Sequence, residues 1–182
     1  MDRCLITSCG GFIGSYLAEF LLSHGCKVAG VVRRDSPHLR DLAGRLEIFT
    51  CDVTDRPSLT RVIREVEPTF VFHLAAEDVI PRSWEDPKTT IETNVIGTIS
   101  ILEGVREVTP RTVVQVAGSA SEYGRCRPRE LPIREAQVPH PQSPYAVSKT
   151  AAIQLAQLYA ARYEMRVHCV RPFQFIGPPE VS

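Results

Sequence analysis

Apolar and polar positions follow two different rhythms along the chain. Short runs rich in β-branched and aromatic residues predict strands, and longer stretches with apolar residues three and four positions apart predict helices. The expected strands cover residues 4–7, 27–32, 46–51, 69–75, 112–118 and 166–172. Strands that alternate with helices predict parallel β-α-β units. We therefore expect an α/β protein with a doubly wound parallel sheet of about six strands and helices on both faces.

Helical patterns fill the gaps between these runs. Residues 12–21 place an apolar face at helix spacing. Asp55 followed by Pro57 predicts the start of another helix, because an acidic cap and a proline in the first turn both favour helix initiation. Residues 88–107 and 143–164 predict two longer helices.

The two central runs, 69–75 and 112–118, are apolar almost throughout, so we expect both faces of these strands to be covered. The proline-rich stretch 127–144 predicts a long loop directly before a helix. A loop of this length in a compact domain is more often functional than idle. The total of 182 residues is enough for one well-buried domain, which we expect to span residues 1–182.

Charge and composition narrow the class of protein. The chain carries 21 basic and 21 acidic residues, and this neutrality argues against nucleic acid or an anionic membrane as the main partner. No apolar run approaches the ~20 residues that span a bilayer. The N-terminus passes from Asp2 directly into strand-like sequence, so we expect no signal peptide and a cytoplasmic protein. The six cysteines lack metal-site spacing, so we expect reduced structural thiols and no metal.

A knot of small residues follows the first expected strand, in the sequence TSCGGFIG (7–14). Gly11 would let the backbone approach a pyrophosphate, and Gly14 would let a helix pack closely on the sheet. The start of that helix presents free N–H groups and the positive end of its dipole to phosphates. The knot therefore predicts the dinucleotide-binding loop of a Rossmann fold, although a plain glycine turn remains the alternative.

Ser8 stands where a dinucleotide loop places its first glycine. Either Ser8 adopts the tight turn itself, or Gly10 takes over the strained backbone angle. The second expected strand ends in Arg33 and Arg34, where an NAD site would carry an acid that binds the ribose hydroxyl. Guanidinium groups suit a 2′-phosphate, so this pair favours NADP(H), with NAD(H) as the alternative.

Seven motifs appear in order along the chain, and Tyr145 and Lys149 stand four apart in the sixth. The motifs are GGFIGSYLAEFLL (10–22), CDVTD (51–55), HLAA (73–76), NVIGT (94–98), GSASEYG (118–124), YAVSK (145–149) and RPFQFIGP (171–178). This set resembles the extended short-chain dehydrogenase/reductase family of nucleotide-sugar epimerases, dehydratases and reductases. The resemblance covers the whole chain.

The resemblance implies a role for each matching position. Thr7, Gly11, Phe12, Ile13 and Gly14 would surround the pyrophosphate, Asp52 and Val53 would meet the adenine, and Leu74, Ala75 and Ala76 would line the cofactor cleft. Asn94 would brace the active-site helix beside the cofactor. Ser119, Tyr145 and Lys149 would be the catalytic residues, and Ser83, Ser119 and Gln174 would bind substrate. His73 is expected to be a packed residue at a strand end.

The implied chemistry is hydride transfer between a nicotinamide and a sugar carbon. A free tyrosine has a pKa of ~10, and we expect a nearby ammonium and the oxidised nicotinamide to lower the pKa of Tyr145. Tyr145 could then exchange a proton with the sugar oxygen near neutral pH, while Ser119 holds that oxygen.

The position of Glu122 bears on which of the family's reactions we expect. The 4,6-dehydratases of the family carry a glutamate two residues after the catalytic Ser or Thr, whereas this chain has Ser121 there and Glu122 one residue later. On an extended strand a shift of one residue turns a side chain to the opposite face. The motifs around Tyr145 and Gln174 are most similar to the reductases that act on GDP-4-keto-6-deoxymannose. GDP-mannose 4,6-dehydratase, UDP-sugar 4-epimerase and a non-catalytic NADP-binding chain stay as alternatives.

The end of the chain and its long helices give two further expectations. The family places a substrate domain after the sixth strand, and we expect this C-terminal domain to be absent. That absence predicts an open cleft with Ser119, Tyr145 and Gln174 facing solvent, exposed apolar surface and weak catalysis. The apolar residues of 88–107 and 143–164 are too numerous for one core-facing stripe, so we expect a homodimer through these helices.

Overall fold

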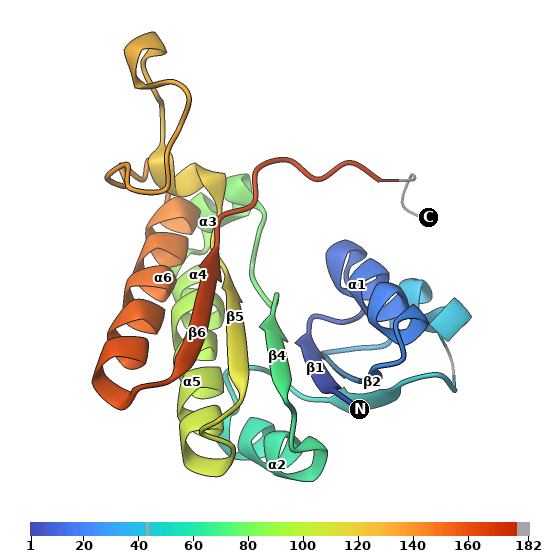
Figure 1. Cartoon of the computed structure of the whole chain (residues 1–182). Helices are drawn as coiled ribbons and strands as arrows, with labels where there is room; N and C mark the ends of the chain where they lie inside the picture. The colour runs from blue at the N-terminus through green and yellow to red at the C-terminus, as the bar shows by residue number, and fades with distance from the viewer. Residues whose placement is uncertain (43, 178–182) are drawn as a thin grey trace.

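The computed structural model describes residues 1–42 and 44–177 (Figure 1). Its six-stranded sheet is parallel throughout and has the order β3-β2-β1-β4-β5-β6. The strands are β1 (Arg3–Thr7), β2 (Lys27–Val32), β3 (Glu47–Thr50), β4 (Phe70–His73), β5 (Val113–Ala117) and β6 (Arg166–Val170). This order is that of the Rossmann fold, and the predicted α/β class is confirmed.

The helices follow the predicted positions with four additions. They are α1 (Phe12–Ser23), α2 (Arg56–Val66), α3 (Ile80–Glu85), α4 (Pro87–Ile91), α5 (Gly97–Val108) and α6 (Pro144–Tyr163). A π-helical segment, Glu92–Ile96, joins α4 to α5, so the helix expected over 88–107 is one continuous helical run with three parts. The added elements are α3 and the 3₁₀ turns η1 (Pro37–Leu42), η3 (Ala120–Tyr123) and η4 (Pro128–Glu130). The α3 helix and these turns are too short to show a helical period.

The ends of the helices have local causes. Asp55 caps α2 by accepting a hydrogen bond from the Ser58 N–H at 3.2 Å. Ser143 caps α6 in the same way, with the Ala146 N–H at 3.1 Å. Both helices carry a proline in the first turn, where its missing N–H has no intrahelical partner to lose. The cap on α6 matters for function, because it fixes the helix that carries Tyr145.

The two faces of the sheet are covered unequally. Helices α2, α5 and α6 bury one face in the main core, which includes Leu5, Val71, Val114, Ile101 and Ile153. On the other face, α1 and η1 cover β1 and β2 and reach Phe72 of β4. The outward residues of β5 are half-buried, and His168 and Val170 on β6 are exposed. The expectation that the two central strands are covered on both faces is therefore wrong for β5, because no described helix packs on that side of it.

Strand order determines where a cleft forms. The chain leaves β1 toward β2 on one side and leaves β4 toward β5 on the other, so a crevice opens at the C-terminal ends of β1 and β4. The segment after β6 runs across this edge toward α1 (Figure 1), and a Cβ at Gly177 would lie 2.5 Å from the Phe12 ring. Among the described helices, none combines the length and apolar character needed to cross a membrane.

Candidate active site

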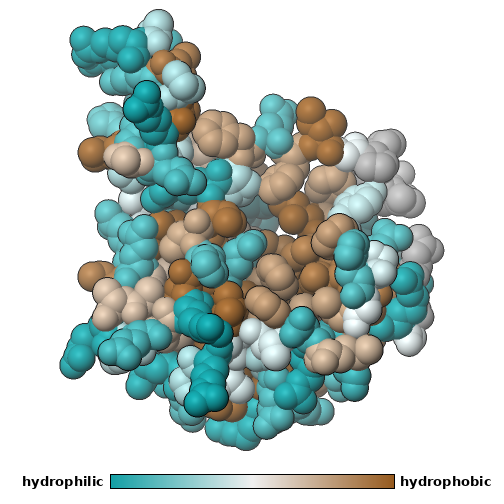
Figure 2. Space-filling model, in the orientation of Figure 1, coloured by the Kyte–Doolittle hydropathy of each residue, from teal (hydrophilic) through white to brown (hydrophobic). Residues whose placement is uncertain are grey.

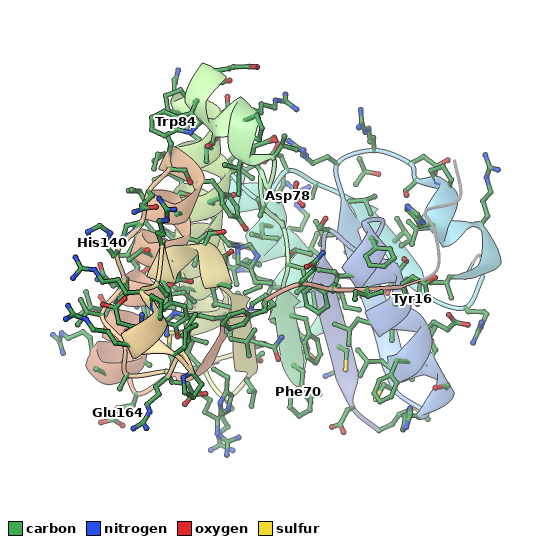
Figure 3. All side chains as sticks on the ribbon, turned by 90° about the horizontal axis from the view of Figure 1, so that it is seen from above. Tyr16, Phe70, Asp78, Trp84, His140 and Glu164 are labelled. Carbon is green, nitrogen blue, oxygen red and sulfur yellow. The ribbon has the colours of Figure 1, made fainter. Side chains whose placement is uncertain are left out.

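A cleft of about 430 Å³ occupies the crevice at the C-terminal edge of the sheet. Figure 2 shows a hollow with apolar side chains around it on the upper part of the molecule. The cleft is lined by Ser8, Gly11, Phe12, Ile13, Gly14, Leu74, Ala76, Asp78, Ile80, Ala117, Gly118, Ser119, Ser121, Tyr145, Lys149, Pro172, Phe173 and Phe175. Seen from above, Asp78 lies between the α1 side and the α6 side of the molecule (Figure 3). The cleft therefore brings the glycine knot and the predicted catalytic residues together.

The glycine knot forms a tight turn that begins α1. Ser8 itself adopts the left-handed conformation with φ of 57°, and its carbonyl accepts a hydrogen bond from the Gly11 N–H at 2.9 Å. Of the two alternatives, the structure shows the first, in which Ser8 makes the turn. A Cβ at Gly14 would lie 2.3 Å from the Ser8 carbonyl oxygen, so only glycine permits this close packing. The N-terminus of α1 then points its free N–H groups toward the cleft.

A small cavity of about 60 Å³ continues the cleft toward β2 and β3. It is lined by Ser8, Val31, Val32, Arg33, Cys51, Val53, Ala75, Ala76 and Thr93. The Ser36 hydroxyl donates to the Gly10 carbonyl at 2.6 Å, which ties the segment after β2 to the glycine knot. Arg33 reaches this cavity, but Arg34 lines neither space. Asp52 is exposed and accepts hydrogen bonds from Thr54.

Thr7 does not reach the cleft. Its buried hydroxyl accepts from the N–H groups of Leu74 and Ala75 at 3.1 and 3.0 Å, and it shares a hydrogen bond with His73. The other ring nitrogen of His73 meets Thr98 at 3.1 Å, and burial lowers the pKa of His73 to about 3. His73 is therefore a neutral, packed residue that joins β4 to β1 and α5.

The predicted catalytic residues come from two elements. Ser119 caps the turn η3 after β5, while Tyr145 and Lys149 lie one turn apart on α6. Tyr145 is 9% and Lys149 6% exposed, so the expectation that Tyr145 faces solvent is wrong. Pro172, Phe173 and Phe175 form the wall beside it. A single cleft nevertheless reaches all three side chains.

Burial shifts the pKa values of Tyr145 and Lys149 in opposite directions. It raises the pKa of Tyr145, against the lowering effect of a hydrogen bond with Ser119, and the Asp78 and Glu122 carboxylates raise it further. The expected lowering of the tyrosine pKa is thus not found in the protein alone. Burial also lowers the pKa of Lys149 to about 8, against the opposing effect of the same two carboxylates.

Asn94 braces the helix that carries Tyr145. Its side-chain amide donates to the Ser148 hydroxyl at 2.8 Å and to the Glu77 carbonyl at 3.1 Å. Its oxygen accepts from the Glu77 N–H at 2.8 Å, and Ser148 in turn donates to the Tyr145 carbonyl at 2.7 Å. Asn94 does not line the cleft, so it acts by linking α6 to the segment after β4.

Glu122 lies in η3 and not on an extended strand, so the strand-based argument about its direction does not apply. Its side chain is fully buried. One carboxylate oxygen accepts from the Ser119 N–H at 2.8 Å, and the other accepts from Arg171 Nε at 2.8 Å. Glu122 thus lies behind Ser119 and is not among the residues that line the cleft.

The structure does not bring the three predicted substrate-binding residues together. Ser119 lines the cleft, but Ser83 is fully buried and its hydroxyl donates to the Ile80 carbonyl at 2.7 Å. Gln174 is exposed and lies between Phe173 and Phe175, which both line the cleft. Alternation of sides along this extended segment could have indicated that Gln174 points away.

Sequence reasoning missed several cleft residues, including Asp78. No motif marked Asp78, because its place in the cleft depends on the Asn94 bonds to the preceding residue. A larger cavity of about 690 Å³ adjoins the long loop, and none of the predicted site residues lines it. All six cysteines are free.

Comparison with known proteins places the chain in a family. The family model described as GDP-mannose 4,6 dehydratase matches residues 5–180. A GDP-mannose 4,6-dehydratase of Vibrio cholerae is 36% identical over an alignment of 174 positions, which covers 87% of this chain and 46% of that protein. A GDP-6-deoxy-D-mannose reductase of Pseudomonas aeruginosa is 31% identical, over 97% of this chain and 53% of its own length.

Solved structures agree with these matches. UDP-glucose 4-epimerase of Thermus thermophilus in complex with NAD superposes with a TM-score of 0.86 and 31% identity, over 93% of this chain and 54% of that one. The RMD protein of Pseudomonas aeruginosa, complexed with NADPH, superposes with a TM-score of 0.80 and 29% identity, over 99% of this chain and 56% of that one. The chain spans about half the length of these relatives. It belongs to the GDP-mannose 4,6-dehydratase family, within the extended short-chain dehydrogenase/reductases that act on nucleotide sugars.

Proposed function

We propose that the protein is an NAD(P)-dependent nucleotide-sugar oxidoreductase that reduces a 4-keto sugar, such as GDP-4-keto-6-deoxymannose, at C4. One observation carries the proposal: Ser119, Tyr145 and Lys149 reach the same cleft as the glycine knot. Relatives with reductase, dehydratase and epimerase activities match this chain, so the class of substrate is supported more strongly than the reaction.

The residues of the cleft fit a dinucleotide. Ser8 and Gly14 form the close approach of backbone and helix, the N-terminus of α1 would face the pyrophosphate, and Val53 lines the small cavity toward which the adenine would extend. Arg33 beside that cavity favours NADP(H), with NAD(H) as the alternative. When bound, the nicotinamide supplies or accepts the hydride.

The chain's own groups handle the proton. The Ser119 hydroxyl oxygen accepts from the Ser121 N–H at 3.1 Å, and its hydrogen bond with Tyr145 holds the two hydroxyls together, where both could meet one sugar oxygen. The Tyr145 phenol is neutral in the protein alone, because burial raises its pKa, so it is poised to give a proton to a ketone oxygen. The Lys149 ammonium would hold the nicotinamide ribose beside Tyr145.

Glu122 favours a reductase or epimerase over a dehydratase. A dehydratase of this family uses a glutamate two residues after the catalytic serine to eliminate water. That place in the cleft is held by Ser121, and both oxygens of Glu122 are engaged by Ser119 and Arg171 outside the cleft. A 4-epimerase would use the same Ser119, Tyr145 and Lys149, so only product analysis separates these two activities.

The test begins with cofactor binding, because the chain spans about half the length of its relatives. NADPH and NADH are titrated separately, with energy transfer from the single tryptophan, Trp84, as the readout. The protein is then incubated with NADPH and GDP-4-keto-6-deoxymannose, and in parallel with UDP-glucose and GDP-mannose, and products are separated by ion exchange. Loss of the keto sugar with NADPH oxidation supports the reductase. A protein that binds neither NADPH nor NADH at millimolar nucleotide concentration would refute the proposal.

A homodimer through α4, α5 and α6 belongs to the same proposal. Of the residues expected at that interface, Leu102, Ala152 and Ala156 are instead buried in the core of one chain. Ile91 remains exposed, together with Ile96, Val147 and Leu158 on the same group of helices. Light scattering of wild type and Leu158→Glu should show a dimer that the substitution dissociates. A monomeric wild type at micromolar concentration would contradict it.

A further inference from the structure

We propose that Glu122 is a positioning residue for the candidate active site: it fixes the turn that carries Ser119 and supplies the buried negative charge that favours the Lys149 ammonium. The proposal rests on the assignment of Ser119 and Lys149 as site residues. Glu122 does not line the cleft, and it meets Ser119 at the backbone N–H and not at the hydroxyl, so it acts only through these neighbours.

The hydrogen bonds of the turn are reciprocal. The Ser119 hydroxyl oxygen accepts from the Ser121 N–H, and the Glu122 carboxylate accepts from the Ser119 N–H at 2.8 Å. This arrangement is a capping box, which satisfies two of the free N–H groups at the start of a helical turn. A Cβ at Gly118 would lie 2.2 Å from the Glu122 carboxylate, so glycine at that position leaves the room that Glu122 needs.

Arg171 ties the same carboxylate to the end of β6. Its Nε donates to the second oxygen at 2.8 Å, and its guanidinium lies over the Tyr123 ring at 5.5 Å. Backbone bonds from Gly118 to the Val170 carbonyl at 2.7 Å and from Ala120 to the Pro172 carbonyl at 2.9 Å join the same two segments. Two charge-assisted bonds offset part of the free energy needed to bury the Glu122 charge.

Glu122 also lies beside the helix that carries Lys149: the Cβ position at Gly118 that faces its carboxylate is 2.9 Å from Ile153, one turn along α6 from Lys149. At this place the negative charge of Glu122 favours the Lys149 ammonium. The groups that face Lys149 are Glu122 from η3, Asp78 from the segment after β4, Tyr145 on its own helix, and His73 from β4, which is neutral because burial lowers its pKa. Burial lowers the pKa of Lys149 to about 8, and Glu122 is the larger of the two influences that oppose this fall. Without Glu122 the pKa should fall further, and the ammonium would be lost near neutral pH.

The test measures Lys149 directly and needs no substrate. The chain has three lysines, Lys27, Lys88 and Lys149, so protein labelled with ¹³C at the lysine ε-carbon gives three resonances to follow against pH. Lys149→Met assigns the third. In Glu122→Gln the midpoint of Lys149 should fall by about one pH unit or more, while Lys27 and Lys88 are unchanged. Glu135→Gln, an exposed glutamate of the long loop, is the matched control and should shift nothing.

A folded Glu122→Gln protein with an unchanged Lys149 midpoint would overturn the charge part of the proposal. If the single variant does not fold, because Arg171 is left without its partner, Glu122→Gln/Arg171→Gln removes both charges. Arg171 is not among the groups that shift Lys149, so the double variant should show the same fall. An unchanged midpoint there would also overturn it.

Amide hydrogen exchange at Ser119 tests the turn. The glutamine of Glu122→Gln still offers an acceptor to the Ser119 N–H, so protection should persist, whereas Glu122→Ala should increase the exchange rate at least tenfold. Equal protection in both variants would overturn the positioning of Ser119. Failure of the wild type to bind NAD(P)H would refute the proposed function and leave these two measurements decisive for Glu122.

Discussion

The two walls of the cleft are built on opposite principles. The glycine wall, residues 8–14, is mainly backbone and depends on the absence of side chains, as the 2.3 Å approach at Gly14 shows. The tyrosine wall, made of Ser119, Tyr145 and Lys149, depends on side chains held by the buried bonds of Asn94 and Glu122. In the glycine wall, the serine that replaces the usual first glycine changes only the local turn. In the tyrosine wall, a substitution should also disturb the side chains that are hydrogen-bonded to the replaced residue.

Substitution of Tyr145 should have the largest effect, because it removes the proposed transferable proton. Tyr145→Phe should lower NADPH oxidation with GDP-4-keto-6-deoxymannose by a factor of about 10³ and leave the cofactor Kd within about twofold. Tyr16→Phe, on the exposed surface of α1, is the control and should keep the wild-type rate. A Tyr145→Phe protein with a normal rate would remove Tyr145 from the mechanism.

The buried Lys149 should make stability depend on pH. Its pKa falls to about 8 in the folded protein and returns to its ordinary value near 10.5 on unfolding. Between these values the unfolded chain binds more protons, so the free energy of unfolding should rise with pH across this window, by about 3 kcal/mol for a shift of this size.

Urea unfolding of wild type and Lys149→Met at pH 7.5, 8.5 and 9.5 measures this contribution as the difference between the two proteins. The difference removes the contributions of cysteines and tyrosines that titrate in the same range. Equal slopes against pH in both proteins would show that the pKa of Lys149 is not perturbed, and that Lys149 is better solvated than its 6% exposure indicates.

The sequence predicted the glycine wall in more detail than the tyrosine wall. Glycines at fixed spacing after a strand have one main physical use, so the loop, the start of α1 and the two alternatives for Ser8 were all predictable. The positions of Tyr145 and Lys149 followed from their separation of four on one helix. The roles of Glu122 and Asp78 were not predictable, because they depend on a 3₁₀ turn and on the Asn94 bonds, which have no local period. Ser83 was misplaced because it lies in α3, which is too short to show a helical period, whereas Gln174 was misplaced although the alternation of sides between Phe173 and Phe175 argues against it.

Arg33 and Arg34 follow β2, next to the glycine wall, on the side where the adenine ribose would lie. Their substitution should have a moderate effect on NADPH binding. Arg33→Ala/Arg34→Ala should weaken NADPH binding by about tenfold and leave NADH unchanged, because only NADPH carries the 2′-phosphate. Arg33→Ala alone should account for most of the loss, since Arg33 lines the small cavity and Arg34 does not. Fluorescence titration measures both nucleotides, and Arg162→Ala on α6 is the control. Equal affinities for NADPH and NADH in the wild type would refute the arginine argument.

Ser8→Gly should have the smallest effect. It tests whether Ser8 contributes only its backbone conformation to the glycine wall, or its side chain as well. Ser8 holds φ of 57°, where a non-glycine residue is strained by about 1 kcal/mol and glycine is not. The greater freedom of glycine in the unfolded chain offsets part of this gain, so the free energy of unfolding should change by less than about 1 kcal/mol. NADPH affinity should stay the same or rise slightly, because the Ser8 carbonyl that holds Gly11 is retained.

Glu164→Gly is the matched control for Ser8→Gly, because Glu164 has φ of 54° at the end of α6, outside the residues that line the cleft. Urea unfolding should move both variants in the same direction, and NADPH titration should leave Glu164→Gly at the wild-type affinity. Ser8 lines both the cleft and the small cavity, so its hydroxyl is placed where a nucleotide could reach it. A clear loss of affinity in Ser8→Gly alone would therefore show that this hydroxyl contacts the cofactor. The glycine wall would then depend on a side chain, as the tyrosine wall does.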